Sequence, residues 1–224
     1  MAGWQFLVDP GRLAITPGEA ITNSLLFAVV GAVIATIVGL IAASLISRGS
    51  TVVASTFDTV LMLPLGTSAV TIGFGFLVAL DEPIDLRGSV LLVPLAHALV
   101  AVPFVVRTTL PTLRAIRTDL REAAAVLGAS PRQVFRHVDL AIVARAAMVG
   151  AGFAAAVSLG EFGATSFIVR PNSVTIPTLI FRLLGRPGAV TFTGAMALSV
   201  ILMLLTTALI LSIDRLRAGE LGEF

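Results

Sequence analysis

The amino-acid sequence contains no cysteine and no lysine, and only 12% of its 224 residues are charged. The absence of cysteine excludes disulfide bonds and thiolate chemistry, and it leaves the redox compartment undetermined. Because all 15 basic residues are arginine, the lysine that a phosphate-binding P-loop requires is missing. If ATP drives this protein, another chain must hydrolyse it.

The fraction of apolar residues is correspondingly high. They make up 57% of the chain, and the mean hydropathy is +1.02, whereas soluble domains are about 45–50% apolar and about 25% charged. A water-soluble fold cannot hide that much apolar surface, so the composition predicts an integral membrane protein. The net charge of +2 is too small to predict a nucleic-acid partner.

Five stretches are apolar and long enough to cross a hydrocarbon core of ~30 Å, which needs ~20 residues of helix. They are Ile21–Ile46, Phe57–Leu80, Gly88–Val106, Ala141–Gly160 and Ala189–Ile213. Only the second and fourth carry a charge: Asp58 at an edge, and Arg145 one turn inside, where its side chain can snorkel to the headgroups. The sequence therefore predicts an all-α, polytopic protein with about five transmembrane helices in residues 21–217.

The first apolar stretch could also be the core of a cleaved signal peptide. Such a core has ~7–15 residues and follows a basic segment. The run from Ile21 to Ile46 is longer, and the residues before it include Asp9, Glu19 and a single arginine, Arg12. We therefore expect this helix to be retained, behind an extracytoplasmic segment of residues 1–20.

Arginine is distributed unequally between the connecting segments, and this predicts the orientation. The loop 107–140, between the third and fourth spans, holds Arg107, Arg114, Arg117, Arg121, Arg132 and Arg136. The positive-inside rule places this loop and the tail 218–224 in the cytoplasm and the N-terminus outside. Arg170, Arg182 and Arg186 then fall in the outer loop, and the larger cytoplasmic cluster is expected to dominate.

The cytoplasmic loop predicts two short helices joined by a tight turn. Leu113, Ile116, Leu120 and Leu127 recur at the spacing of one helix face and need a surface to pack against. The predicted helix starts and ends are Asp119 with Glu122 as a capping box, Gly128 after a helix end, and Ser130–Gln133 with Pro131 as a second start. Such an elbow, attached to two spans, can carry a push from a soluble partner into the membrane.

Three motifs in this loop stand at a characteristic spacing. Glu122–Ala124 is followed after three residues by Gly128, and after nine more by Val138–Leu140. This arrangement resembles the EAA loop of binding-protein-dependent ABC importers, whose pattern is E-A-A-x3-G-x9-I-x-L-P. Val138 replaces the isoleucine, and Ala141 replaces the proline, which removes a helix-starting residue before the fourth span.

The resemblance implies that the chain is one permease half with the type I ABC importer (MetI-like) fold, in the bacterial inner membrane. It implies that the loop is a coupling helix on a separate nucleotide-binding ATPase subunit. The implied contact residues are Glu122, Ala123, Ala124, Gly128, Ser130 and Pro131. A second permease half, separate or identical, and a periplasmic or lipoprotein solute-binding protein would complete the importer. The chain itself would have neither an ATPase site nor a cofactor.

A second resemblance concerns the transported solute. Gly160–Gly163, Thr175–Thr178 and Phe181–Gly185 resemble the C-terminal half of ferric-iron and thiamine permeases. Those permeases commonly fuse two halves in one chain, whereas this sequence holds one half. The resemblance implies ferric iron or thiamine as the substrate, and it leaves other small solutes such as sulfate or a phosphonate open.

Polar residues near the spans are candidates for the translocation pathway. Glu161, next to Phe162 at the outer end of the fourth span, could face the pathway, or it could be an interfacial carboxylate in water. His97 lies mid-span between Pro94 and Pro103, where we favour an interhelical hydrogen bond over a pathway role.

The outer loop contains a possible docking point for the solute-binding protein. Pro177–Leu184 predicts a short helix from which Arg182 projects, and Arg170 lies shortly before it. Anchoring of an amphipathic turn at the membrane interface explains this segment equally well. No group of His, Asp and Glu has the spacing of metal ligands.

Two other functional classes remain open. A secondary transporter or channel would need charged coupling residues within the spans or an inverted repeat, and neither is clear in the sequence. The elbow sequence also resembles a DNA-binding helix-turn-helix, but ~30 residues tethered at both ends to membrane spans leave little room for the trihelical domain that this motif requires.

Overall fold

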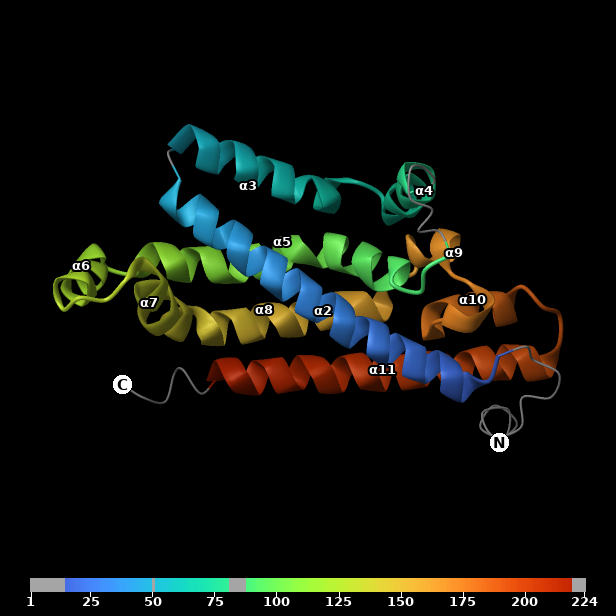
Figure 1. Cartoon of the computed structure of the whole chain (residues 1–224). Coiled ribbons are helices and arrows are strands. Elements are labelled where there is room, and N and C mark those ends of the chain that lie inside the picture. Colours follow the sequence, from blue (N-terminus) through green and yellow to red (C-terminus); the bar gives the residue numbers. More distant parts are fainter. Residues whose placement is uncertain (1–14, 50, 81–87, 219–224) are drawn as a thin grey trace.

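The computed structural model describes residues 15–49, 51–80 and 88–218, which form a bundle of long helices with short helices at both ends (Figure 1). The α-helices are α2 (Pro17–Arg48), α3 (Thr51–Gly66), α4 (Ala69–Ala79), α5 (Leu92–Ala115), α6 (Thr118–Val126), α7 (Pro131–Val134), α8 (Leu140–Gly160), α9 (Thr165–Ile168), α10 (Ile176–Leu184) and α11 (Ala189–Ala218). A π-helix, Phe135–Asp139, joins α7 to α8, and a 3-10 turn, Pro171–Ser173, precedes α10. The predicted all-α class is confirmed. Most of the expected segments 1–20 and 218–224 lie outside the described residues.

Four of the five predicted spans are single helices. Within the described residues, α2, α5, the run Pro131–Gly160 and α11 are each long and apolar enough to cross a membrane. The stretch Phe57–Leu80, expected to be one span, is divided between two helices, α3 and α4, which are bent by 105° relative to each other. Counted as one broken span, the pair brings the total to five.

The bend between α3 and α4 has a local cause and a tertiary one. Pro64, which lacks an N–H, lies in the last turn of α3. Beyond the bend, a Cβ on Gly73 would lie 2.6 Å from the carbonyl oxygen of Ala164, and a Cβ on Gly163 would lie 2.7 Å from the Cβ of Ala69. Glycine on both sides therefore lets α4 lie directly against the chain around α9.

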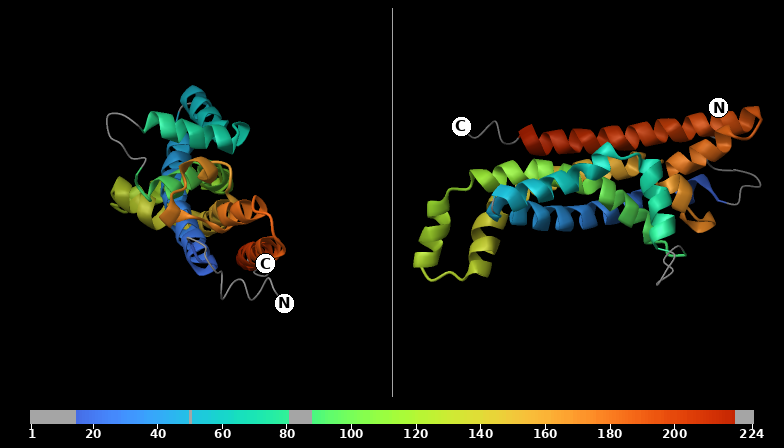
Figure 2. Two further views of the ribbon diagram at one scale, coloured as in Figure 1. Left: turned by 90° about the vertical axis from the view of Figure 1, so that its right-hand side faces the viewer. Right: turned by 90° about the horizontal axis from the view of Figure 1, so that it is seen from above.

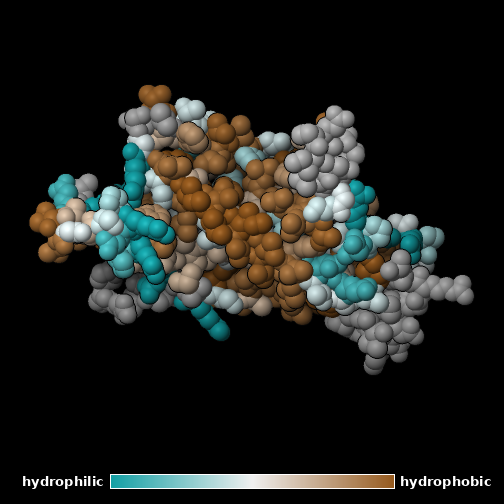
Figure 3. Space-filling model, in the orientation of Figure 1, coloured by the Kyte–Doolittle hydropathy of each residue, from teal (hydrophilic) through white to brown (hydrophobic). Residues whose placement is uncertain are grey.

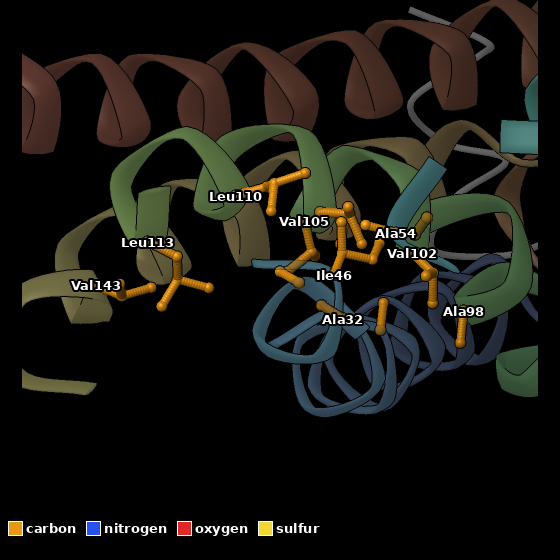
Figure 4. Close-up of a cluster of buried hydrophobic side chains, with 14 of the residues drawn as sticks. Ala32, Ile46, Ala54, Ala98, Val102, Val105, Leu110, Leu113 and Val143 are labelled. Atoms are coloured by element: carbon orange, nitrogen blue, oxygen red, sulfur yellow. The ribbon is translucent and has the colours of Figure 1, made fainter. Parts of the chain in front are cut away.

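Helix α5 is the centre of the bundle and packs between α2 and α8. Of its most apolar window 67% is buried, against 17% for α11 at the periphery. Figure 4 shows the core that these helices share, with Val102, Val105 and Leu110 of α5 facing side chains of α2 and α8. Because lipid is as apolar as leucine, this association depends on close packing rather than on expulsion of water.

Small residues bring the backbones of these helices together. A Cβ added to Gly39 of α2 would lie 2.7 Å from the Cβ of Val105, and one added to Gly150 of α8 would lie 3.1 Å from the Cα of the same valine. Val105 therefore lies between two glycines, which let α2 and α8 approach α5 closely at this position.

The surface carries a belt of apolar side chains between two polar ends (Figure 3). Along α2, one exposed stripe follows the helical period through Leu26, Val29, Val33, Ile37, Ile41 and Leu45. In water this area of exposed aliphatic surface would drive aggregation, whereas in a bilayer it meets acyl chains. The belt thus agrees with the multi-pass membrane placement.

The two ends of the bundle carry different short elements. The start of α2 lies at the same end as α9 and α10, whereas α6, α7 and the C-terminal end of α11 lie at the opposite end (Figures 1 and 2). A capping box between Thr16 and Glu19, with the Thr16 N–H donating to Glu19 Oε2 over 2.8 Å, fixes the start of α2. The start of α2 and the C-terminal end of α11 therefore lie at opposite ends of the bundle.

Gly39→Ala is expected to destabilise the bundle, because its methyl group would overlap Val105. Overpacking of this kind lowers the free energy of unfolding by about 1–3 kcal/mol. Gly75→Ala is the matched control, since no atom lies within 4 Å of the added Cβ and alanine favours helix. Thermal unfolding of the detergent-solubilised chain, followed by circular dichroism, measures both; equal midpoints for the two variants would contradict the close-approach argument.

Candidate functional site

The loop between α5 and α8 forms the predicted elbow. Helix α6 and helix α7 lie side by side and turn away from the long axis of the bundle (Figure 2). At the end of α6, the Gly128 N–H donates to the Ala125 carbonyl over 2.9 Å and the Ala129 N–H to the Ala124 carbonyl over 3.0 Å. Gly128 adopts a φ of 87°, so the expected left-handed glycine is confirmed and closes a Schellman motif.

One predicted helix start is confirmed and one is wrong. The Ser130 N–H donates to Gln133 Oε1 over 2.8 Å, which is the expected capping interaction, and Pro131 occupies the first turn of α7. Asp119 does not cap α6, whose preceding residue is Arg117. Its carboxylate instead accepts hydrogen bonds from the Arg117 side chain, at 2.7 and 3.1 Å, because the arginine lies within reach just outside the helix.

The elbow presents the EAA-like residues at its surface. Glu122, Ala123, Gly128, Ser130 and Pro131 are exposed, and Ala124 is half-buried. The expected apolar stripe divides in two. Leu113 and Ile116 are buried in the bundle, whereas Leu120 is 48% and Leu127 88% exposed.

Leu127 and its neighbour Val126, which is 87% exposed, form the tip of the elbow. An apolar tip beyond the level of the membrane belt, on a rigid helical hairpin, is a feature of protein contact surfaces. The exposed part of the stripe thus lies at the end of α6, outside the apolar belt of the spans.

The elbow continues into the fourth span without a break. The run Pro131–Gly160 satisfies the length and composition of one membrane helix, and within it the Leu140 N–H donates to the Phe135 carbonyl, five residues earlier. With Ala141 in place of a proline, every backbone N–H at this junction can donate. The two helices are therefore joined through a π-helical turn with no non-helical residue between them.

Asp139, in that π-helical turn, is fully buried and is held by two arginines. Arg121 of α6 donates from Nε to Asp139 Oδ1 over 2.7 Å, and Arg48, at the end of α2, donates from Nη2 to Oδ2. Sequence reasoning quoted Asp139 only as a position in the motif. The available signal was an isolated carboxylate among arginines at the start of an apolar run.

At the other end of the bundle, a buried polar network joins α5 to the chain that follows α8. His97 lies within hydrogen-bond distance of two hydroxyl groups, with Nδ1 2.6 Å from Ser158 Oγ and Nε2 2.7 Å from Thr165 Oγ1. The Ser158 hydroxyl also reaches the carbonyl of Phe27 on α2, at 3.4 Å. The expected interhelical hydrogen bond of His97 is confirmed.

Glu161 belongs to the same network, and the alternative of an interfacial carboxylate in water is wrong. The residue is 7% exposed. Its carboxylate accepts hydrogen bonds from the backbone N–H groups of Ala164 and Thr165, at 2.8 and 3.0 Å, and from the Thr165 hydroxyl at 2.5 Å. His97 Nε2 lies 3.5 Å from Glu161 Oε2. These bonds hold the turn between α8 and α9, where exposure to solvent was expected.

Phe162 contacts helix α10, and Arg182 belongs to that helix. The ring of Phe162 packs on Phe181 at a centroid distance of 5.1 Å and an interplanar angle of 49°. The short helix expected over Pro177–Leu184 is present as α10, and Arg182 is exposed on it.

The opposite face of α10 is anchored on the bundle. Its N-terminal backbone is tied to α2, because the Ile176 N–H donates to Ser24 Oγ over 2.8 Å. Arg170 is also exposed at this end. Near it, a hollow of about 680 Å³ is lined by polar groups of α2 and of the turn before α10, including Thr16, Glu19 and Asn172.

Known proteins are similar to this chain in sequence and in fold. The family described as "Binding-protein-dependent transport system inner membrane component" matches residues 35–218. A protein named as a 2-aminoethylphosphonate transport system permease of Salmonella typhimurium is 32% identical over 73% of this chain and 61% of its own length. The sulfate transport system permease protein CysW of Synechococcus elongatus is 33% identical over 72% of this chain and 62% of its own length.

A third relative, the molybdenum transport system permease protein ModB of Escherichia coli, is 31% identical over 73% of this chain and 80% of its own length. One solved structure, an amino acid ABC transporter with histidines, superimposes with a TM-score of 0.61 at 16% identity, covering 87% of this chain and 89% of that one. That likeness establishes the fold. The chain spans about 61% of the length of the first of these relatives. The family match covers residues 35–218, which is most of this chain. The chain therefore belongs to the inner membrane components of binding-protein-dependent transport systems.

Proposed function

We propose that this chain is one permease half of an ABC importer and couples to a separate ATPase subunit through its elbow. The observation that carries the proposal is the exposed Glu122–Ala124 segment with its apolar tip, held by the Gly128 turn at one end of a membrane bundle. The family match supports it. The chain would supply the pathway, and the ATPase would supply the chemistry.

The rigid connections of the elbow support a mechanical role. At one side α6 follows α5, the most buried helix of the bundle, after a break of two residues. At the other side α7 runs on into α8. Closure of a nucleotide-binding dimer beneath the elbow would then move both helices and change access to the pathway. By linkage, a loaded binding protein on the outer side would alter ATP turnover inside.

The proposed orientation follows from the same elbow. If it meets a cytoplasmic ATPase, the end of the bundle with α6 and α7 is cytoplasmic, the C-terminal end of α11 shares that side, and α2 begins on the outer side. The arginines of residues 107–140 support this orientation through the positive-inside rule.

For the substrate, we propose a small oxyanion. The relatives carry the names of 2-aminoethylphosphonate, sulfate and molybdenum systems, and these solutes share a tetrahedral anionic centre when molybdenum is carried as its oxyanion. Ferric iron or thiamine, which the Gly160–Gly163 segment suggested, is the second class to test. Competition for uptake between labelled sulfate, molybdate, phosphonate, ferric iron and thiamine distinguishes the two classes.

A second permease half would complete the pathway. The exposed apolar stripe of α2 and the exposed side chains of α11, such as Phe192 and Met203, provide more apolar surface than a lone bundle needs. We propose that part of this surface faces the second half, separate or identical, and that the rest faces lipid. Residues that line the pathway would come from both halves.

Glu122→Arg is expected to release the ATPase without affecting membrane insertion, because the side chain is exposed on the contact surface and makes no bond that holds the fold. The measurement is co-purification of a P-loop ATPase with the detergent-solubilised chain. Recovery of the ATPase with the parent chain and its loss with Glu122→Arg support the proposal. A chain that reproducibly purifies without any ATPase would favour an ATP-independent transporter.

Arg182→Glu, at the opposite end, serves as a control for Glu122→Arg and as a test of the docking proposal. We propose that Arg170 and Arg182 contribute to the surface that receives the solute-binding protein. The charge reversal is expected to weaken stimulation of ATP hydrolysis by the loaded binding protein, more strongly at low ionic strength, because exposed charges act over about 10 Å at 0.1 M salt. ATPase co-purification should be unchanged; stimulation equal to that of the parent would exclude Arg182 from the docking surface.

His97→Leu tests whether the outer network positions the chain around α9. The substitution removes the two hydrogen bonds of the imidazole, worth about 0.5–1.5 kcal/mol each, while the Ser158 hydroxyl keeps the Phe27 carbonyl and the Thr165 hydroxyl keeps Glu161 as a partner. We expect a lower thermal midpoint and slower uptake, with ATPase co-purification unchanged. If uptake slows while the thermal midpoint stays at that of the parent, His97 acts in the pathway instead.

A further inference from the structure

The buried carboxylate of Asp139 connects three parts of the chain that are far apart in sequence. It belongs to the π-helical turn between the elbow and α8, whereas Arg121 comes from the first helix of the elbow and Arg48 from the last turn of α2. Each carboxylate oxygen serves a different arginine, Oδ1 for Arg121 and Oδ2 for Arg48. These three residues, Arg48, Arg121 and Asp139, are called the inner clasp below.

Because Asp139 is buried, the residues of the inner clasp must keep a defined hydrogen-bond geometry. A buried carboxylate must have charged or hydrogen-bonding partners, because its desolvation is otherwise uncompensated. The side chain of Asp139 has no exposed surface, while those of Arg121 and Arg48 are 25% and 48% exposed. Charge-assisted hydrogen bonds in such a setting are short and directional. The clasp therefore restricts both the distance and the angle between its three elements.

The local backbone supports the same arrangement. The guanidinium of Arg48 lies 5.8 Å from the ring centroid of Phe135, the first residue of the π-helix, a distance typical of a cation–π contact. Phe135 and Asp139 mark the two ends of that turn, and both contact Arg48. A π-helical turn inserts one residue into the helical repeat. It therefore determines which side chains at the junction of α7 and α8 face α2.

A second Asp–Arg pair in the bundle lacks these features. Asp58 of α3 and Arg107 of α5 approach to 3.7 Å, with side chains 28% and 57% exposed. A partly exposed pair at this distance is weakly constrained. It provides a matched carboxylate control for Asp139.

We propose that Asp139 is a positioning residue that fixes the elbow to α2, so that a displacement of the elbow moves α2 together with α5 and α8. This inference rests on the proposed function for its mechanical meaning. The covalent chain links the elbow only to α5 and α8, and the inner clasp adds the helix that carries the exposed apolar stripe. The clasp makes the three core helices respond to the elbow as one unit.

The absence of cysteine makes the geometry directly measurable. Val126→Cys at the elbow tip and Leu45→Cys near the end of α2 introduce two exposed sites for spin labels into an otherwise thiol-free chain. Pulsed electron resonance on the full-length chain in lipid nanodiscs then reports the distance distribution between elbow and α2. We expect a narrow distribution in the labelled parent, a broad one with Asp139→Asn, and a narrow one with Asp139→Glu and with Asp58→Asn.

The importer reconstituted with its ATPase provides the functional readout. A purely structural role for Asp139 would reduce the amount of active importer but leave the number of solutes moved per ATP unchanged. The positioning role predicts that Asp139→Asn lowers this ratio by about fivefold or more, the lower range of measured couplings between sites, and that Asp139→Glu restores most of it. Asp58→Asn should leave the ratio unchanged.

The outcomes separate this inference from the proposed function. A narrow elbow–α2 distribution in Asp139→Asn, or an unchanged ratio of solute to ATP, overturns the positioning role. If Asp139→Asn does not fold, Arg121→Gln removes the Oδ1 partner and must broaden the same distribution. If the parent shows no ATP-dependent uptake, the proposed function fails, and the spin-label distances still decide whether Asp139 holds the elbow to α2.

Discussion

The hydrocarbon core of a bilayer offers no hydrogen-bond partner, and this constraint governs where polar side chains lie in this bundle. Several of the buried polar groups within or beside the described spans lie in two compact sets, one at each end of the helices. His97, Ser158, Thr165 and Glu161 form the outer set, and Asp139 with its arginines forms the inner one. Between them the helices meet through glycine, alanine and aliphatic side chains.

Close packing provides the cohesion that hydrophobic burial cannot provide in lipid. Gly39 and Gly150 bring α2 and α8 against Val105 of α5, while Gly73 and Gly163 bring α4 against the turn before α9. The first contact unites the three core helices. The second contact holds α4 beside the polar network around His97. Because α4 has only 11 residues, it is too short to cross the membrane alone and contributes to this end of the bundle instead.

Local sequence signals predicted much of this architecture. Apolar run length located the spans, and the turn at Gly128 and the capping residues Ser130 and Gln133 defined the elbow, because each depends on neighbours within a few residues. The bend of α3 against α4 and the burial of Glu161 could not be read in this way. Both depend on partners brought close only by folding, such as Ala164 beside Gly73. Asp139 was missed for the same reason, since Arg48 lies 91 residues away in the chain.

The length of α8, which runs from the elbow to the polar network around His97, has a geometric consequence. Its 21 residues span about 32 Å at 1.5 Å per residue. If α8 pivots at the end that joins the elbow, its far end moves by about 3 Å for a tilt of only about 5°. Ser158 lies near that far end and is 2.6 Å from His97, a separation that tolerates a few tenths of an ångström. The amplitude of any tilt of α8 is thus limited unless α5 moves with it or the bond to His97 breaks, so this hydrogen bond would act as a mechanical stop at the end of the bundle opposite the elbow.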